Sequence, residues 1–249
     1  HFFNPVAQMP LVEIVHTEKT DPELISQAAA FVKAIARSPL PVLSSPGFLV
    51  NRVLMPYLAE AMMMFEEGID KQAIDKAAVA FGMPMGPIAL ADKVGLDVCM
   101  HVAENLCEQF GGKVSSKLIE MVKDGQLGVK SGKGFYEYDK KGKPIKQASN
   151  TVSRNADISD RLVLRMLNEA VTCLQEGVVV SEDLLDAGMI FGTGFAPFRG
   201  GPLHYAKNRG LKEVVLKLES FSKQYGERFI PREGWQLLLE ENQLEDQSA

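Results

Sequence analysis

The chain has 249 residues, of which 46% are hydrophobic and 24% charged, and its formal net charge at pH 7 is −5. This length suffices for one large or two small cores, and the negative charge gives no reason to expect nucleic acid or an anionic membrane as a partner. No apolar run reaches the ~18 residues that a membrane span needs. Three cysteines without a CxxC pair and four histidines without metal-ligand spacing predict neither a disulfide framework nor a metal site.

The first segment places a histidine and a carboxylate on either side of a turn signal. His1 precedes the dipeptide Asn4-Pro5, and the β-branched apolar run 11–15, with Glu13 at its centre, predicts a strand. An ionised carboxylate inside a strand is costly unless it is paired, and His1 is the nearest partner if the chain doubles back. Such a pair would fix the imidazole tautomer and leave its other nitrogen free to take a proton. The alternative is that both side chains are merely solvated.

The rest of the chain is predominantly helical in pattern. Asp21 suits an N-cap, and Pro22 the first position of a helix that extends to about Ala36 and presents one apolar face. Prolines 39 and 41 end that helix, and residues 41–43 predict a short extended piece. Further helices are predicted over residues 48–67, 71–81, 88–94, 96–110 and 115–124.

The glycine-rich stretch 128–134 invites comparison with a phosphate-binding loop. Its spacing is GxxxGK followed by glycine, and no buried strand precedes it, so the comparison fails. We expect a mobile basic loop that leads into an extended piece over 135–138. Residues 139–157 are rich in Lys, Gly, Ser and Asn and are predicted to form a linker.

The second half of the chain repeats the first. Arg52 and the glutamates that follow it return at a constant displacement of 109, from Arg161 to Glu176, and the segment from Phe81 to Pro87 returns as 191–197. Self-similarity on this scale predicts two helical units that cover each other's apolar faces. The position that corresponds to Asn51 is Asp160, and no HFFNP sequence precedes it. We therefore expect a structural role for the second copy.

Three motifs in this order resemble the L-3-hydroxyacyl-CoA dehydrogenase family: HFFNP at residues 1–5, Glu13, and PGFLVNR at residues 46–52. The tandem repeat is similar to that of multifunctional fatty acid β-oxidation α-subunits, in which an enoyl-CoA hydratase/isomerase domain precedes the dehydrogenase. The resemblance implies a mainly α fold with two tandem helical repeats of the 6-phosphogluconate dehydrogenase C-terminal type. The tail strands and helix of a truncated dinucleotide-binding domain precede them. The expected divisions are residues 1–44, 45–140 and 158–249.

The resemblance also implies an activity, the oxidation of L-3-hydroxyacyl-CoA to 3-ketoacyl-CoA with NAD as hydride acceptor. His1 would be the general base, Glu13 would orient it, and Asn51 would offer its amide to the substrate. The ordinary alternative is that Asn51 caps a helix. Asn4 matches a position near substrate and nicotinamide, with a simple turn residue as the alternative.

The sequence contains no GxGxxG after a strand, so the element that would hold a dinucleotide pyrophosphate is missing. With no initiator methionine or leader, we expect a fragment that is inactive by itself. Its expected partners are an acyl-CoA substrate, upstream NAD-binding and enoyl-CoA hydratase domains, and a thiolase subunit. The expected location is the cytoplasm of a bacterium, with a mitochondrial matrix as the alternative. A helical assembly module without catalysis and a dehydrogenase of another hydroxyacid remain open, and acyl chain length is not readable.

Overall fold

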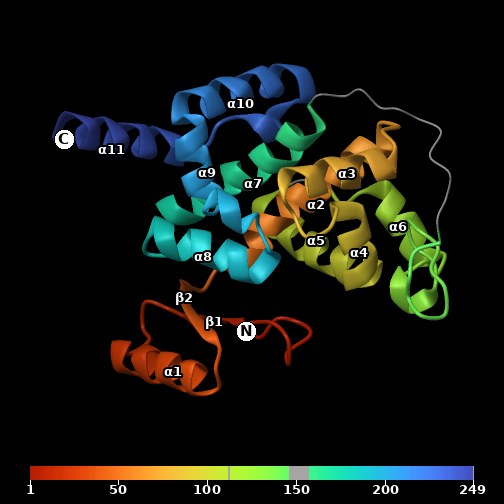
Figure 1. Ribbon diagram of the computed structural model, residues 1–249, viewed down its shortest axis with the longest axis horizontal. Helices are drawn as coiled ribbons and strands as arrows, with labels where there is room; N and C mark the ends of the chain where they lie inside the picture. The colour runs from red at the N-terminus through yellow and green to blue at the C-terminus, as the bar shows by residue number, and fades with distance from the viewer. Residues whose placement is uncertain (112, 146–156, 249) are drawn as a thin grey trace. The chain divides into compact units, whose positions relative to one another are not determined.

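The computed structural model describes residues 1–111, 113–145 and 157–248, and in these ranges it has eleven α-helices, three 3-10 helices and two β-strands (Figure 1). The contacts divide the chain into two compact units, His1–Leu54 with Leu164–Ala249, and Met55–Val163. Both boundaries fall inside helices. The predicted linker lies largely in 146–156, outside the described residues. None of the described helices is long and apolar enough to cross a membrane.

The first unit begins with a strand, a helix and a strand that together form a two-stranded parallel sheet. β1 (Leu11–His16) leads through α1 (Pro22–Ala34) to β2 (Ser38–Leu43), and the register runs from Leu11 opposite Ser38 to His16 opposite Leu43. Parallel strands require a crossover of this kind, which is why α1 packs beside the strands (Figure 1). The predicted tail of an α/β domain is therefore present.

Two prolines occur in β2 at positions that cost the sheet no hydrogen bond. Pro39 and Pro41 alternate with Leu43, whose N–H turns away from β1 and donates to the carbonyl of Val178 at 2.9 Å. The nitrogens of the prolines have the same orientation, because backbone direction repeats every two residues in a strand. The extended piece predicted for 41–43 is thus part of a longer strand.

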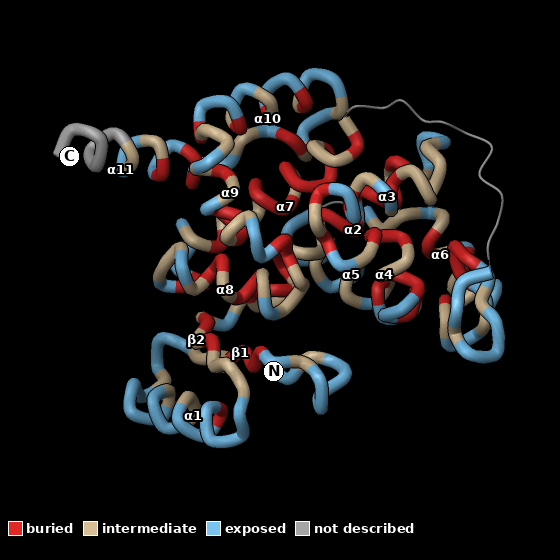
Figure 2. The backbone as a smooth tube through the Cα atoms, in the orientation of Figure 1, coloured by how far each residue is buried: buried red, intermediate tan, exposed pale blue. Residues whose placement is uncertain are grey.

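Helix α1 begins as predicted but differs in its end and in its burial. The Asp21 carboxylate caps it by accepting the N–H of Glu23 at 2.9 Å, and the helix ends at Ala34 because Ala36 has a positive φ of 56°. Of its apolar residues only Val32 is buried, whereas Leu24 and Phe31 are 57% and 60% exposed. Figure 2 shows that most of α1 is exposed. The predicted apolar face therefore exists but is largely uncovered.

The first unit continues with helices of the C-terminal half. These are α7 (Ile158–Gln175) from Leu164 onward, α8 (Glu182–Thr193), η2 (Pro197–Arg199), α9 (Pro202–Arg209), α10 (Leu211–Tyr225), η3 (Glu227–Phe229) and α11 (Gly234–Ser248). The side chain of Asn168 joins α7 to the start of α11, since it donates to the carbonyl of Ile230 and accepts from the Arg232 amide and the Trp235 indole. Both polar atoms of this buried side chain therefore have hydrogen-bond partners.

The second unit consists of helices from the first half. It contains α2 (Val50–Glu66) from Met55 onward, α3 (Lys71–Phe81), α4 (Pro87–Val94), α5 (Leu96–Phe110), α6 (Ser116–Lys123), η1 (Val129–Ser131) and the first turns of α7. The predicted ranges hold to within two residues, and Pro56 lies inside a continuous α2.

The glycine-rich loop of the second unit is tied to a buried carboxylate, which the expectation of a mobile loop missed. Asp92 accepts the N–H groups of Phe135 and Tyr136 at 2.9 and 2.8 Å. A Cβ on Gly134 would lie 2.0 Å from the Asp92 carboxylate, so only glycine allows this approach. Gly128, whose added Cβ would lie 2.1 Å from the carbonyl oxygen of Asp92, and Gly134 thus allow close packing around Asp92.

Helices of the two halves correspond in order and length. Both α4 and α9 have 8 residues, and both α5 and α10 have 15. Gly95 ends α4 and begins α5 with a φ of +106°, and Gly210 does the same between α9 and α10 with a φ of +98°. These matches support the predicted duplication, whose linear division into 1–44, 45–140 and 158–249 stays a prediction.

The structural register of the repeat differs from the predicted one from α8 onward, because the N-caps Asp70 and Ser181 are 111 residues apart, whereas Phe81 was predicted to correspond to residue 191 at a displacement of 110. The carboxylate of Asp75 accepts two N–H groups from the first turn of α4, and that of Asp186 accepts two from the first turn of α9. Pro87, which starts α4, therefore corresponds to Pro202 and not to Pro197. The sequence pattern misled because η2 is inserted before α9.

Candidate active site

Backbone pairing places His1 beside Glu13. The chain turns at Asn4-Pro5, where the carbonyl of Pro5 accepts the amides of Gln8 and Met9, and it returns antiparallel so that Phe2 lies opposite Val12. The N–H of Glu13 donates to the carbonyl of His1 at 3.1 Å. Directly opposed residues in such a ladder have side chains on the same face. The Nδ1 atom of His1 accordingly lies 2.7 Å from Oε2 of Glu13, which confirms that the two side chains are in contact.

Glu13 is 1% exposed, and its two oxygens make three hydrogen bonds. Oε2 bonds to His1, while Oε1 accepts the backbone N–H groups of Leu49 and Val50 at 3.1 and 2.9 Å. These amides lie at the N-terminus of α2, where unpaired N–H groups and the helix dipole favour a negative charge. The buried carboxylate therefore caps a helix that begins 37 residues later in the chain.

The imidazole of His1 has one nitrogen engaged and one available. An ionised carboxylate only accepts hydrogen bonds, so the proton of neutral His1 is on Nδ1 and the lone pair is on Nε2. Among the described residues Nε2 has no hydrogen-bond partner, and the side chain is 28% exposed. The rings of Phe3 and Phe48, with centroids at 4.6 and 5.4 Å, flank the imidazole. Nε2 is thus oriented as a proton acceptor.

A strained turn before α2 aims its amides at Glu13. Gly47 and Phe48 have positive φ angles of 78° and 52°, and the carbonyl of Gly47 accepts the N–H of Arg52 at 3.2 Å. A left-handed conformation costs a non-glycine residue about 1–2 kcal/mol, so its surroundings must enforce it at Phe48. The sequence signal was the Pro46-Gly47 dipeptide, yet nothing in it indicated the partner of the amides that follow.

Two further predicted site residues lie in the same segments. Asn51 is in the first turn of α2, directly after Val50, and is half-buried. It is inside the helix, so it does not cap α2. Asn4 is exposed in the turn, and among the described residues neither amide side chain makes a hydrogen bond. The structure brings together His1 and Glu13, and it attaches the helix that carries Asn51 to the same carboxylate.

Arg52 follows Asn51 and is 3% exposed. Its Nε donates to Glu169 at 2.7 Å, and one terminal nitrogen donates to Glu176 at 2.6 Å and to the hydroxyl of Ser45 at 2.9 Å. Burial opposes the charge of Arg52, but the hydrogen bonds to Glu176 and Glu169 outweigh it, so the pKa of the guanidinium is raised. Arg52 thus remains a fixed cation next to the site.

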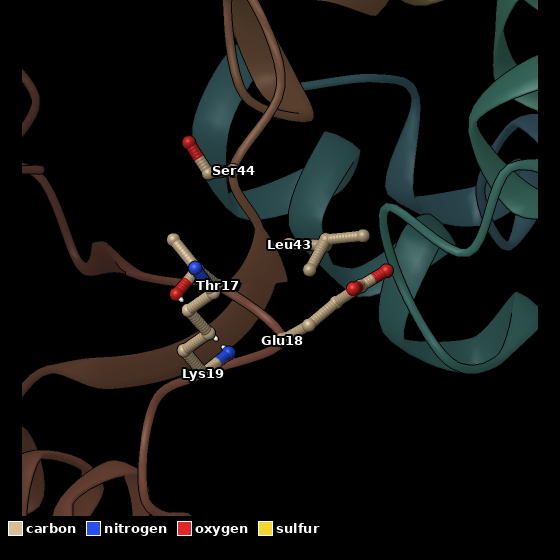
Figure 3. A pocket seen from close by; sticks show the side chains of 5 residues that line it. All are labelled: Thr17, Glu18, Lys19, Leu43 and Ser44. Carbon is tan, nitrogen blue, oxygen red and sulfur yellow. Dashed lines mark hydrogen bonds between the residues drawn. The ribbon is translucent and has the colours of Figure 1, made fainter.

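A hollow of about 390 Å³ lies at the carboxyl ends of the two strands and is separate from this pair. Figure 3 shows the side chains of Thr17, Glu18 and Lys19, which follow β1, around Leu43 and Ser44 at the end of β2. No predicted site residue lines it. Within the described ranges no three His, Cys, Asp or Glu side chains are grouped so that they could hold a metal ion.

Two family models match this chain. Residues 1–45 match the NAD binding domain of 3-hydroxyacyl-CoA dehydrogenase, and residues 47–138 match the C-terminal domain of the same enzyme, together more than half of the chain. The chain belongs to the 3-hydroxyacyl-CoA dehydrogenase family. The matched ranges contain every residue of the candidate site.

The curated relatives within the family include fatty acid oxidation complex subunits alpha. The protein from Shewanella putrefaciens is 40% identical over 255 residues, which cover 97% of this chain and 36% of that protein. The protein from Vibrio vulnificus is 41% identical over 94% of this chain and 35% of its own length. The chain therefore spans about a third of the length of these relatives.

Solved structures of the family have the same fold. The 3-hydroxybutyryl-CoA dehydrogenase of Escherichia coli superposes with a TM-score of 0.81 at 26% identity, over 97% of this chain and 70% of that one. The dehydrogenase part of multifunctional enzyme 1 from C. elegans gives a TM-score of 0.70 at 30% identity, over 95% and 58%. The mainly helical fold, preceded by a strand, a helix and a strand that match the NAD binding domain, is thereby confirmed.

Proposed function

We propose that this chain is the C-terminal part of an NAD-dependent L-3-hydroxyacyl-CoA dehydrogenase of fatty acid β-oxidation. The observation that carries the proposal is the buried Glu13 carboxylate that holds Nδ1 of His1 at 2.7 Å and leaves Nε2 without a partner among the described residues. Oxidation of a secondary alcohol needs a base for the hydroxyl proton, and this arrangement provides one. The names of the relatives supply the substrate class.

In this reaction bound NAD+ would accept the hydride that leaves the carbon bearing the hydroxyl group. Nε2 of His1 takes the hydroxyl proton, and the Glu13 carboxylate stabilises the imidazolium that results. The side-chain amide of Asn51 makes no hydrogen bond within the described chain, so it is available to donate to a substrate oxygen. Asn4, exposed in the adjoining turn, takes the weaker role of a contact near the nicotinamide.

The residues present fit only part of an NAD site. Two parallel strands and α1 belong to a dinucleotide-binding sheet, but the sequence has no GxGxxG turn to hold a pyrophosphate. We therefore assign the remaining NAD contacts to the segment that lies upstream in the longer relatives. The 249-residue chain by itself is expected not to reduce NAD+, and a protein that joins it to a complete dinucleotide-binding domain (the completed enzyme) is expected to do so.

By the same reasoning, the natural setting is a bacterial fatty acid oxidation complex in the cytoplasm. The expected neighbours are the upstream NAD-binding and enoyl-CoA hydratase domains and a thiolase subunit. These expectations rest on the names and lengths of the relatives. A pull-down of the completed enzyme with a thiolase subunit of a relative tests the last of them.

The test of the proposed function is NADH formation by the completed enzyme with three substrates. L-3-hydroxybutyryl-CoA is expected to be oxidised, whereas its D-enantiomer and free L-3-hydroxybutyrate are not. Preferential oxidation of the free acid would support a dehydrogenase of another hydroxyacid instead. No oxidation of any substrate, with the fold intact, would leave a helical assembly module as the function.

A further inference from the structure

We propose that Glu169 on α7 and Glu176, the residue that follows α7, are positioning residues that act on the catalytic pair through Arg52. The inference rests on the proposed function and deepens it, because it gives the duplicated half of the chain a part in the reaction. All residues concerned belong to the first compact unit.

An ion-pair cluster around Arg52 lies at the start of α2. Arg52 is 3% exposed, Glu169 18% and Glu176 49%, and the two hydrogen bonds between them are 2.7 and 2.6 Å long. Charge-assisted bonds of this length to a buried guanidinium fix the orientation of the residue that makes them. Arg52 comes two residues after Val50, so α7 holds the helical turn that supplies the amide bonds to Glu13.

Helix α8 packs against the same turn of α2. A Cβ on Gly188 would lie 3.2 Å from Cδ2 of Leu49, and one on Gly192 would lie 2.9 Å from both γ carbons of Val50. Two glycines one helical turn apart thus let α8 approach the side chains of the two residues whose amides bind Glu13. The C-terminal helices therefore restrain this turn both by charge and by close contact.

These glycines have no equivalent in the first half. The N-caps Asp70 and Ser181 set an offset of 111 between α3 and α8, which places Ala77 and Phe81 where α8 has Gly188 and Gly192. The C-terminal half thus carries a close-approach surface that is absent from its counterpart.

The carboxylate of Glu13 connects this turn to the imidazole of His1. The carboxylate of Glu13 is shared, since Oε1 holds the amides of Leu49 and Val50 and Oε2 holds His1. A displacement of the turn therefore shifts the carboxylate and, with it, Nε2. Displacements of about 1 Å in a catalytic group can cost a hundredfold in rate.

The duplication supplies a matched control. In the second compact unit Arg161, 1% exposed, donates to Glu60 at 2.7 Å and to Glu67 at 2.6 Å, so the same ion-pair geometry recurs at an offset of 109. Arg161 follows Asp160, which corresponds to Asn51, and no buried carboxylate equivalent to Glu13 is seen at this helix in the described residues. This cluster has the chemistry of the first without its catalytic neighbours.

The experiment compares the double variants Glu169→Gln/Glu176→Gln and Glu60→Gln/Glu67→Gln. Amide hydrogen exchange is measured in the 249-residue chain, and kcat and KM for the acyl-CoA in the completed enzyme. We expect the first variant to exchange the amides of Leu49 and Val50 about tenfold faster and to lower kcat by about tenfold with little change in KM. The control variant should leave both quantities within about twofold of the wild type.

The single variants Glu176→Gln and Glu67→Gln replace side chains that are 49% and 41% exposed, so they keep the comparison valid if a double variant fails to fold. Equal exchange at Leu49 and Val50 in the two series would overturn the inference. So would a fall in kcat without faster exchange. If the unmodified completed enzyme shows no activity, the proposed function fails, and the exchange comparison still decides whether α7 positions this turn.

Discussion

Replacing Glu13 by glutamine is expected to reverse the tautomer of His1. The two oxygens of Glu13 accept three hydrogen bonds, from Nδ1 of His1 and from the amides of Leu49 and Val50. A glutamine has one oxygen and one NH2 group, so it cannot accept on both sides. Either the oxygen keeps the two amides and the NH2 faces Nδ1, or the NH2 faces the two amides.

The structure decides between these orientations. Turning the NH2 toward Leu49 and Val50 leaves two buried N–H donors without an acceptor, at a cost of about 1–3 kcal/mol each. The other orientation costs nothing at the helix and makes Nδ1 the acceptor. Neutral His1 then carries its proton on Nε2 and has no lone pair there for the substrate. Loss of general base catalysis lowers a rate by about 10²–10⁴.

The assay is ¹⁵N NMR of the imidazole nitrogens in the neutral state of the chain. The wild type is expected to show a protonated Nδ1, and Glu13→Gln a protonated Nε2, with kcat of the completed enzyme falling by about 10²–10⁴. Glu18→Gln, at an exposed carboxylate just after β1, is the matched control and should change neither. A wild-type imidazole protonated on Nε2, or the same tautomer in both proteins, would contradict this role of Glu13.

Three further outcomes are expected. Asn51→Ala should lower kcat of the completed enzyme by about tenfold or more and change the free energy of unfolding by less than about 0.5 kcal/mol, because its side chain makes no hydrogen bond within the described chain; a loss of stability that matches the loss of rate would contradict this. Gly192→Ala should destabilise the chain by about 1–3 kcal/mol in urea unfolding, since its Cβ would meet both γ carbons of Val50 at 2.9 Å. Burial raises the pKa of Asp75 to about 6 in the folded chain, above its value in the unfolded chain. Protonated Asp75 therefore adds at most about 3 kcal/mol to the free energy of unfolding below about pH 4, and this contribution is lost as the pH rises through 6. A carboxyl ¹³C titration of Asp75 with a midpoint below 4 would contradict that assignment.

Local signals in the sequence were sufficient where the partners are close along the chain. The turn at Asn4-Pro5 brings His1 to Glu13 across twelve residues, and a carboxylate within an apolar strand demanded a partner, so the pair was predictable. The cap at Asp21 followed from the same kind of local chemistry. The offset of 109 was readable in the sequence, whereas the ion pairs that Arg52 and Arg161 form with glutamates of the other copy were not.

Long-range relations were not predictable from the residues alone. No periodicity indicates that Glu13 caps a helix beginning at Val50, because that contact depends on how the turn at Gly47 folds back onto β1. The apolar face of α1 was expected from spacing, but spacing does not say whether another segment covers Phe31. The repeat register failed at Pro197 because a 3-10 turn was inserted there.

The most direct test of the account is the rate of NADH formation by the completed enzyme when His1 is replaced by glutamine, a side chain of similar size that cannot act as a base near neutral pH. If His1 is the general base, kcat falls by about 10²–10⁴ while KM for the acyl-CoA changes little. A His1→Gln enzyme that turns over within about threefold of the wild type would contradict it, since His1 would then not be the residue that accepts the proton.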